Sequence, residues 1–115
     1  MSSAYLEPEL SASTRDVHRA LSSLQEELEA VDYYHQRAEQ TQDAELKRLL
    51  EHNREEEAEH AAMLFEWLRR HAPDFDAKMK QYLFARGDLT EVEARVEGGG
   101  ADRTDPGALG LGSLA

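Results

Sequence analysis

The chain has 115 residues, a formal net charge of -11 and no cysteine. This length predicts a single domain with a thin core, which a second copy would help to complete. The negative charge argues against nucleic acid or an anionic membrane surface as partner. Without cysteine, any metal must be held by oxygen and imidazole ligands, which points to iron or manganese. Residues 1–10 lack the basic start and apolar run of a signal peptide, so we expect a cytoplasmic protein.

Residues 1–12 are expected to form a flexible leader, and the sequence Ser13-Thr14-Arg15-Asp16 has the form of a capping box that opens a helix. Apolar residues then recur at alternating steps of four and three, which predicts one long helix as far as about Gln40. These residues are Val17, Leu21, Leu24, Leu28, Val31 and Ala38. The short polar stretch 41–43 predicts an antiparallel reversal, with Asp43 as N-cap of the next helix.

The second helix is predicted over residues 44–70, because Pro73 breaks the pattern. Pro73 is suited to the first turn of a shorter third helix that ends near Arg86. Residues 88–97 are acidic and predict only a weak extension, so we expect an ordered domain over 13–97 and a linker with a tail over 98–115. The predicted fold is all-α: an antiparallel two-helix hairpin plus a short third helix, which dimerises into a four-helix bundle.

Polar residues interrupt the apolar seam of the second helix at its centre. The seam comprises Leu46, Leu50, Asn53, Glu57, His60, Leu64 and Trp67. Glu57 and His60 form a Glu-x-x-His motif, which places a carboxylate and an imidazole on adjacent turns of one face, as in carboxylate-bridged di-metal sites. The simpler interpretation is a core histidine paired with a glutamate, or a solvated run of charges that happens to be in register.

A complete four-helix di-metal site needs two such motifs and two further glutamates. This chain offers one motif and Glu27, which flanks the seam of the first helix, so two chains must combine. Such ligands leave positions open for dioxygen or peroxide and favour ferric over ferrous iron, so oxidation of Fe(II) is the expected reaction. Tyr34, one heptad after Glu27, is expected close to the site. We interpret the second such spacing, Asp32-x-x-His35, as a surface or supporting pair.

Several segments, in order, resemble the encapsulated ferritin family. They are residues 26–32 (EELEAVD), 52–54 (HNR), 59–63 (EHAAM) and 66–70 (EWLRR), and the closing 109–114 (LGLGSL) is similar to the family's encapsulin-targeting peptide. The resemblance implies a ferritin-like ferroxidase with two irons per dimer, whose dimers form a ring of ten subunits inside an encapsulin nanocompartment. Glu27, Glu57 and His60 would be the ligands, Tyr34 a nearby tyrosine, and Glu26 with Glu29 a site through which metal arrives.

The chain departs from the family at Tyr33, where a tryptophan is expected, and at His35, where an acidic residue is expected, so access of metal to the site can differ. Residues 106–115 would dock to the shell, although a frayed terminus of small residues has the same composition. Two other functions stay open. One is a rubrerythrin-like or manganese oxidoreductase on the same scaffold, and the other is a helical hairpin adaptor without activity.

Overall fold

The computed structural model describes residues 6–98 as four helices, with no strand among them. They are α1 (Ala12–Gln40), α2 (Ala44–His71), α3 (Pro73–Tyr82) and α4 (Leu89–Gly98). The chain divides into two compact units, the first ending at His71 and the second beginning at Ala72. The predicted all-α class is confirmed. Residues 1–5 of the predicted leader and 99–115 of the predicted tail lie outside the described residues.

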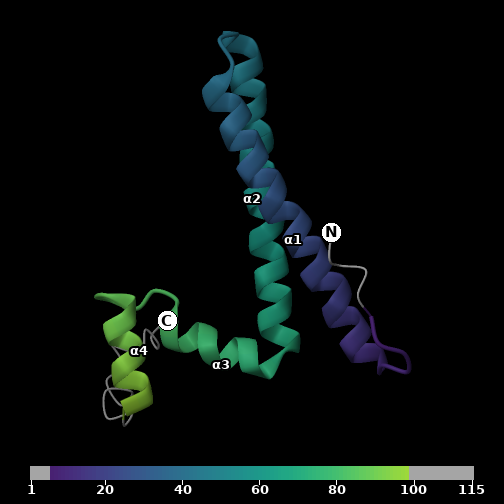
Figure 1. The fold of residues 1–115 in the computed structure, drawn as a ribbon, viewed down its shortest axis with the longest axis vertical. Helices are drawn as coiled ribbons and strands as arrows, with labels where there is room; N and C mark the ends of the chain where they lie inside the picture. Colours follow the sequence, from purple (N-terminus) through teal and green to yellow (C-terminus); the bar gives the residue numbers. More distant parts are fainter. Residues whose placement is uncertain (1–5, 99–115) are drawn as a thin grey trace. The chain divides into compact units, whose positions relative to one another are not determined.

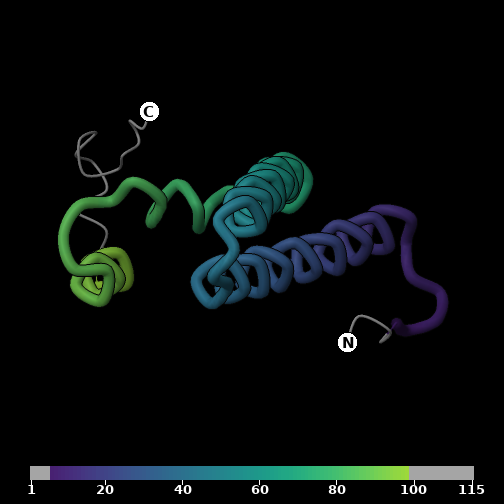
Figure 2. The backbone as a smooth tube through the Cα atoms, turned by 90° about the horizontal axis from the view of Figure 1, so that it is seen from above, coloured from purple at the N-terminus to yellow at the C-terminus, as the bar shows by residue number. Residues whose placement is uncertain are grey.

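The first unit is the predicted antiparallel hairpin of α1 and α2. Figures 1 and 2 show the two helices side by side near their connecting turn and further apart towards the other end. The Asp43 carboxylate caps α2, accepting a hydrogen bond from the Leu46 backbone N–H at 2.8 Å. Lys47 Nζ donates to the carbonyl of Ala38 at 3.0 Å, which satisfies an end group of α1 and fixes the turn.

The predicted start of α1 is wrong by two residues. The N-cap is Ser11, whose Oγ accepts from the Thr14 N–H at 3.1 Å, and the helix begins at Ala12. Ser13 therefore lies in the first turn. The reason is that Ser11 has an extended backbone and stands three residues before Thr14, the geometry that an N-cap needs.

The buried face of α2 is rotated by one residue from the predicted seam. Ala61 and Leu68 are buried, whereas their seam neighbours His60 and Trp67 are only half-buried and Leu46 is exposed. On α1, Ala20, Leu24 and Ala38 are buried, but Leu28 keeps 46% of its surface exposed. Two helices that separate along their length cannot cover both seams completely, so the core is thin, as its composition predicts.

The second unit contains α3 and α4. Pro73 occupies the first turn of α3 as predicted, but the helix ends at Tyr82, four residues before the expected end. Phe84 and Gly87 both have positive φ, which turns the chain. The Asp88 carboxylate then accepts from the N–H groups of Thr90 and Glu91 and opens α4, where only a weak extension was expected. Within residues 6–98, no helix is both long and apolar enough to cross a membrane.

Candidate metal centre

The hairpin brings Glu27 of α1 together with Glu57 and His60 of α2. Each side chain offers one potential ligand atom, and these atoms all lie within 4.8 Å of one another. His60 Nδ1 is 3.2 Å from Glu57 Oε1 and 3.4 Å from Glu27 Oε1. The local reason is that residues three apart share a helix face, so Glu57 and His60 point together towards α1. These are the three residues that the sequence analysis selects as ligands.

The two carboxyl groups influence each other's protonation. The hydrogen bond and the charge of Glu57, together with burial, raise the pKa of Glu27, while the hydrogen bond from Glu27 lowers the pKa of Glu57. The pair therefore retains one proton more readily than isolated carboxyls do. Burial alone lowers the pKa of His60, but its hydrogen bond to Glu57 and the charge of Glu27 outweigh burial, so the pKa of His60 is raised.

This cluster fits a divalent cation. It has more acidic than basic groups, and the buried Glu27 Oε1 makes no hydrogen bond among the described residues, only its 3.4 Å ion pair with His60. In the absence of metal, the two carboxylates favour the protonated form of His60, which is why its pKa is raised. Two carboxylates and one imidazole are donors suited to iron or manganese, and binding of either ion must displace protons from the cluster.

The other predicted site residues lie outside this three-residue cluster. Tyr34 is half-buried further along α1, with the Arg37 guanidinium 5.8 Å from its ring centre. Glu26 and Glu29 are exposed. The Tyr33 hydroxyl donates to Glu29 at 3.2 Å, and the negative charge of Glu29 raises the pKa of Tyr33. Tyr33 and Glu29 therefore share a surface of α1.

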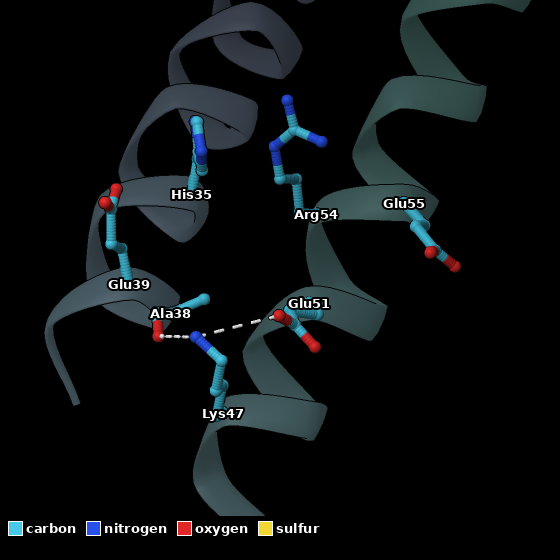
Figure 3. A pocket seen from close by; sticks show the side chains of 7 residues that line it. All are labelled: His35, Ala38, Glu39, Lys47, Glu51, Arg54 and Glu55. Atoms are coloured by element: carbon cyan, nitrogen blue, oxygen red, sulfur yellow. Dashed lines mark hydrogen bonds and ion pairs between the residues drawn. The ribbon is translucent and has the colours of Figure 1, made fainter. Parts of the chain in front are cut away.

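The residues of the Asp-x-x-His spacing on α1, Asp32 and His35, are exposed. Asp32 accepts a hydrogen bond from Gln36 at 2.9 Å, and neither Asp32 nor His35 belongs to a cluster of potential ligands among residues 6–98. His35 instead borders a pocket of about 570 Å³ that also contains Arg54 (Figure 3). Arg54 was not predicted as a site residue, although its position three residues before Glu57 places it on a neighbouring turn of α2.

A helical hairpin with two carboxylates and a histidine on its facing helices defines a ferritin-like protein. The family model described as EncFtn-like matches residues 4–86. The "Ferritin-like protein" of Thermotoga maritima is 48% identical over 116 residues, covering 99% of this chain and 100% of the relative. The "Encapsulated ferritin-like protein" of Rhodospirillum rubrum is 45% identical over 114 residues, covering 91% of this chain and 81% of the relative.

A crystal structure of a Nitrosomonas europaea protein has the same fold. It matches with a TM-score of 0.72 and 58% sequence identity, over 75% of this chain and 97% of that protein. The chain belongs to the EncFtn-like, encapsulated ferritin family.

Proposed function

We propose that the protein is a ferroxidase that oxidises Fe(II) to Fe(III) with dioxygen. The observation that carries the proposal is the convergence of Glu27, Glu57 and His60 within 4.8 Å from two helices. Oxygen donors favour the ferric state, so the two carboxylates assist loss of an electron from the bound substrate iron. His60 gives up a proton as iron binds, which returns its neutral imidazole to the role of ligand.

The site is proposed to be completed by a second copy of the chain. One chain supplies only half of the ligands that a four-helix di-iron site requires, and two chains would hold two irons per dimer. Large apolar side chains are exposed on both helices of the hairpin unit, which favours an apolar interface between copies. They include Leu28, Leu46, Leu49, Met63 and Phe65. By family resemblance, the dimers assemble further into a ring of ten subunits.

Residues around the cluster have supporting roles in this proposal. Tyr34, half-buried one heptad after Glu27, is proposed to act near the centre, while the exposed Glu26 and Glu29, with Tyr33, are proposed to gather Fe(II) from solvent. An exposed pair of carboxylates binds iron more weakly than a half-buried cluster of three ligands, so it affects the arrival of iron and not the redox step.

Delivery of the iron to an encapsulin shell is the second part of the proposal. The name of the Rhodospirillum rubrum relative supports encapsulation, and residues 106–115 contain the three leucines that resemble a targeting peptide. Docking of one tail is expected to be weak, but a ring that carries ten tails would dock by avidity. We expect deletion of residues 106–115 to leave soluble, iron-oxidising protein that is absent from shells purified after co-expression. Equal packaging of the truncated chain would rule out the tail as the address.

Anaerobic iron titration followed by exposure to air tests the enzyme assignment. We expect about two Fe(II) per dimer, in line with two irons in a complete four-helix site, and rapid appearance of Fe(III) after oxygen is admitted. Parallel titrations with Mn(II) and with peroxide in place of oxygen test the alternative oxidoreductases. A helical adaptor would bind no iron tightly, and that result would refute the ferroxidase proposal.

A further inference from the structure

Arg54 on α2 has no counter-ion among the residues that the structure describes. Its Nε is buried without a hydrogen-bond partner, and among residues 6–98 the guanidinium makes neither a hydrogen bond nor an ion pair. A half-buried guanidinium is normally paired, since removing its charge from water without compensation is unfavourable. The absence of a partner is notable in a chain with 24 acidic and 13 basic residues.

Arg54 projects into the pocket of about 570 Å³ between the C-terminal half of α1 and the N-terminal half of α2. Figure 3 shows the Arg54 guanidinium and the His35 imidazole on facing sides of this pocket. The third basic residue there, Lys47, is already engaged, because its Nζ contacts the Ala38 carbonyl at 3.0 Å and Glu51 at 3.8 Å. Arg54 and His35 are therefore the donors that remain for a ligand.

We propose that Arg54 and His35 form a binding site for a small oxyanion, namely free inorganic phosphate. A guanidinium offers a planar set of N–H donors that matches two oxygens of such an anion, and an imidazole N–H can donate to a third. A small anion also fits an open pocket that needs no rearrangement of the helices.

The acidic residues that line the pocket limit the affinity without preventing binding. Glu51 is paired with Lys47. Glu39 and Glu55 are exposed, and Figure 3 shows the Glu55 carboxylate directed away from Arg54. No group of these carboxylates with His35 comes close enough to hold a metal ion within the described chain. A carboxylate of a second copy is the alternative partner of Arg54.

The site lies close to the candidate metal centre but uses different residues. Arg54 precedes Glu57 by three residues, about one helical turn, so phosphate on Arg54 would sit beside the cluster without any of its ligands. Phosphate binding can therefore be measured without iron, and its failure would leave the ferroxidase proposal untouched.

The test is a calorimetric titration of inorganic phosphate into the full-length chain at constant ionic strength, with chloride as the screening control. We expect saturable binding that Arg54→Gln weakens at least about tenfold, the loss of one charge-assisted contact. Arg48→Gln is the matched control, because it removes the same charge from an exposed position of α2 outside the pocket. We expect His35→Gln to weaken binding less than Arg54→Gln.

Native mass measured on the same samples separates the two possible partners of Arg54. The proposal expects Arg54→Gln to keep the parent oligomeric state while losing phosphate. Loss of the dimer in Arg54→Gln, without phosphate binding by the parent chain, would assign the guanidinium to a carboxylate of a second copy and overturn the proposal. The proposal would also be overturned if Arg48→Gln weakened phosphate binding as much as Arg54→Gln does, or if titration with chloride released the same heat as titration with phosphate.

Discussion

Two charged clusters lie nine residues apart on α2 and have opposite charge balance. Around Glu66, one carboxylate accepts hydrogen bonds from two arginines: from Arg69 Nε and Nη2, both at 2.9 Å, and from Arg70 Nε at 2.8 Å. Around Glu57, two carboxylates share one imidazole. The arginines lower the pKa of Glu66 to about 2, whereas the pKa of Glu27 beside Glu57 is raised.

The difference shows what distinguishes a structural ion cluster from a candidate metal centre. Glu66 is satisfied by its own helix through residues three and four positions away, so it needs no further cation. Glu27 and Glu57 come from different helices and repel each other when both are ionised. A cation bound between Glu27 on α1 and Glu57 on α2 would remove the repulsion between the two carboxylates.

The largest expected effect comes from removing a ligand of the Glu57 cluster. Glu57→Ala and His60→Ala should each reduce the rate of Fe(II) oxidation by at least about 100-fold, because each deletes a donor to the substrate iron. Absorbance of Fe(III) under air measures the rate, and circular dichroism should show nearly unchanged helix content.

The matched control is Glu66→Ala, which removes a carboxylate from the same helix but from the balanced cluster. We expect it to oxidise iron at the parent rate. If Glu57→Ala or His60→Ala also keeps the parent rate, the convergence of these residues is not the oxidation site.

A second test uses the metal itself. In the proposed dimer, iron would neutralise the Glu57 cluster where two copies meet, so metal binding should favour association. We expect Fe(II) to lower the dissociation constant of the dimer by about tenfold, with further assembly towards the ring. Sedimentation at several protein concentrations measures this shift. An identical distribution of oligomers with and without iron would refute the coupling, although not the enzyme assignment.

A smaller effect is expected from exposed carboxylates on the α1 surface near the cluster. The double variant Glu26→Ala/Glu29→Ala should slow oxidation about threefold at low iron and have little effect at saturating iron, because these groups only concentrate Fe(II). Initial rates over a range of iron concentrations measure the change. Complete loss of bound iron in this variant would contradict a role limited to gathering metal.

The smallest effect concerns the stability of the metal-free protein. Glu27 has a raised pKa, so the folded state loses stability as pH rises through that value. Glu27→Gln mimics the protonated carboxyl and can still donate to Glu57, so we expect stabilisation by about 0.5 kcal/mol at pH 7. Urea denaturation without metal measures the change in free energy of unfolding.

Glu66→Gln should have the opposite sign. Because the pKa of Glu66 is lowered to about 2, its contribution is fully present above the unfolded value of roughly 4.3 and is lost as pH falls towards 2. The variant should be slightly less stable than the parent at neutral pH and equal to it near pH 2. If Glu27→Gln and Glu66→Gln change the free energy of unfolding in the same direction at pH 7, the two clusters do not differ in the way described.

Features that depend on neighbours within one or two helical turns were predictable from the sequence alone. The sequence determined two long helices, the Asp43 cap, the start of α3 at Pro73 and the shared face of Glu57 and His60. Each depends on local backbone geometry, on a capping side chain or on the 3.6-residue period. The cap at Asp88 is also local, and the spacing of Asp88 three residues before Glu91 is typical of a helix N-terminus, although α4 was expected only as a weak extension.

Only the tertiary structure decided which faces of the two helices meet. The way α1 and α2 pack determines that Ala61 and Leu68 are buried while Leu28 and Leu46 are exposed. It also places Arg54 across a pocket from His35, with no partner for its guanidinium in the described part of the chain. These features join residues tens of positions apart, and a helical period specifies a face but not the surface that it meets.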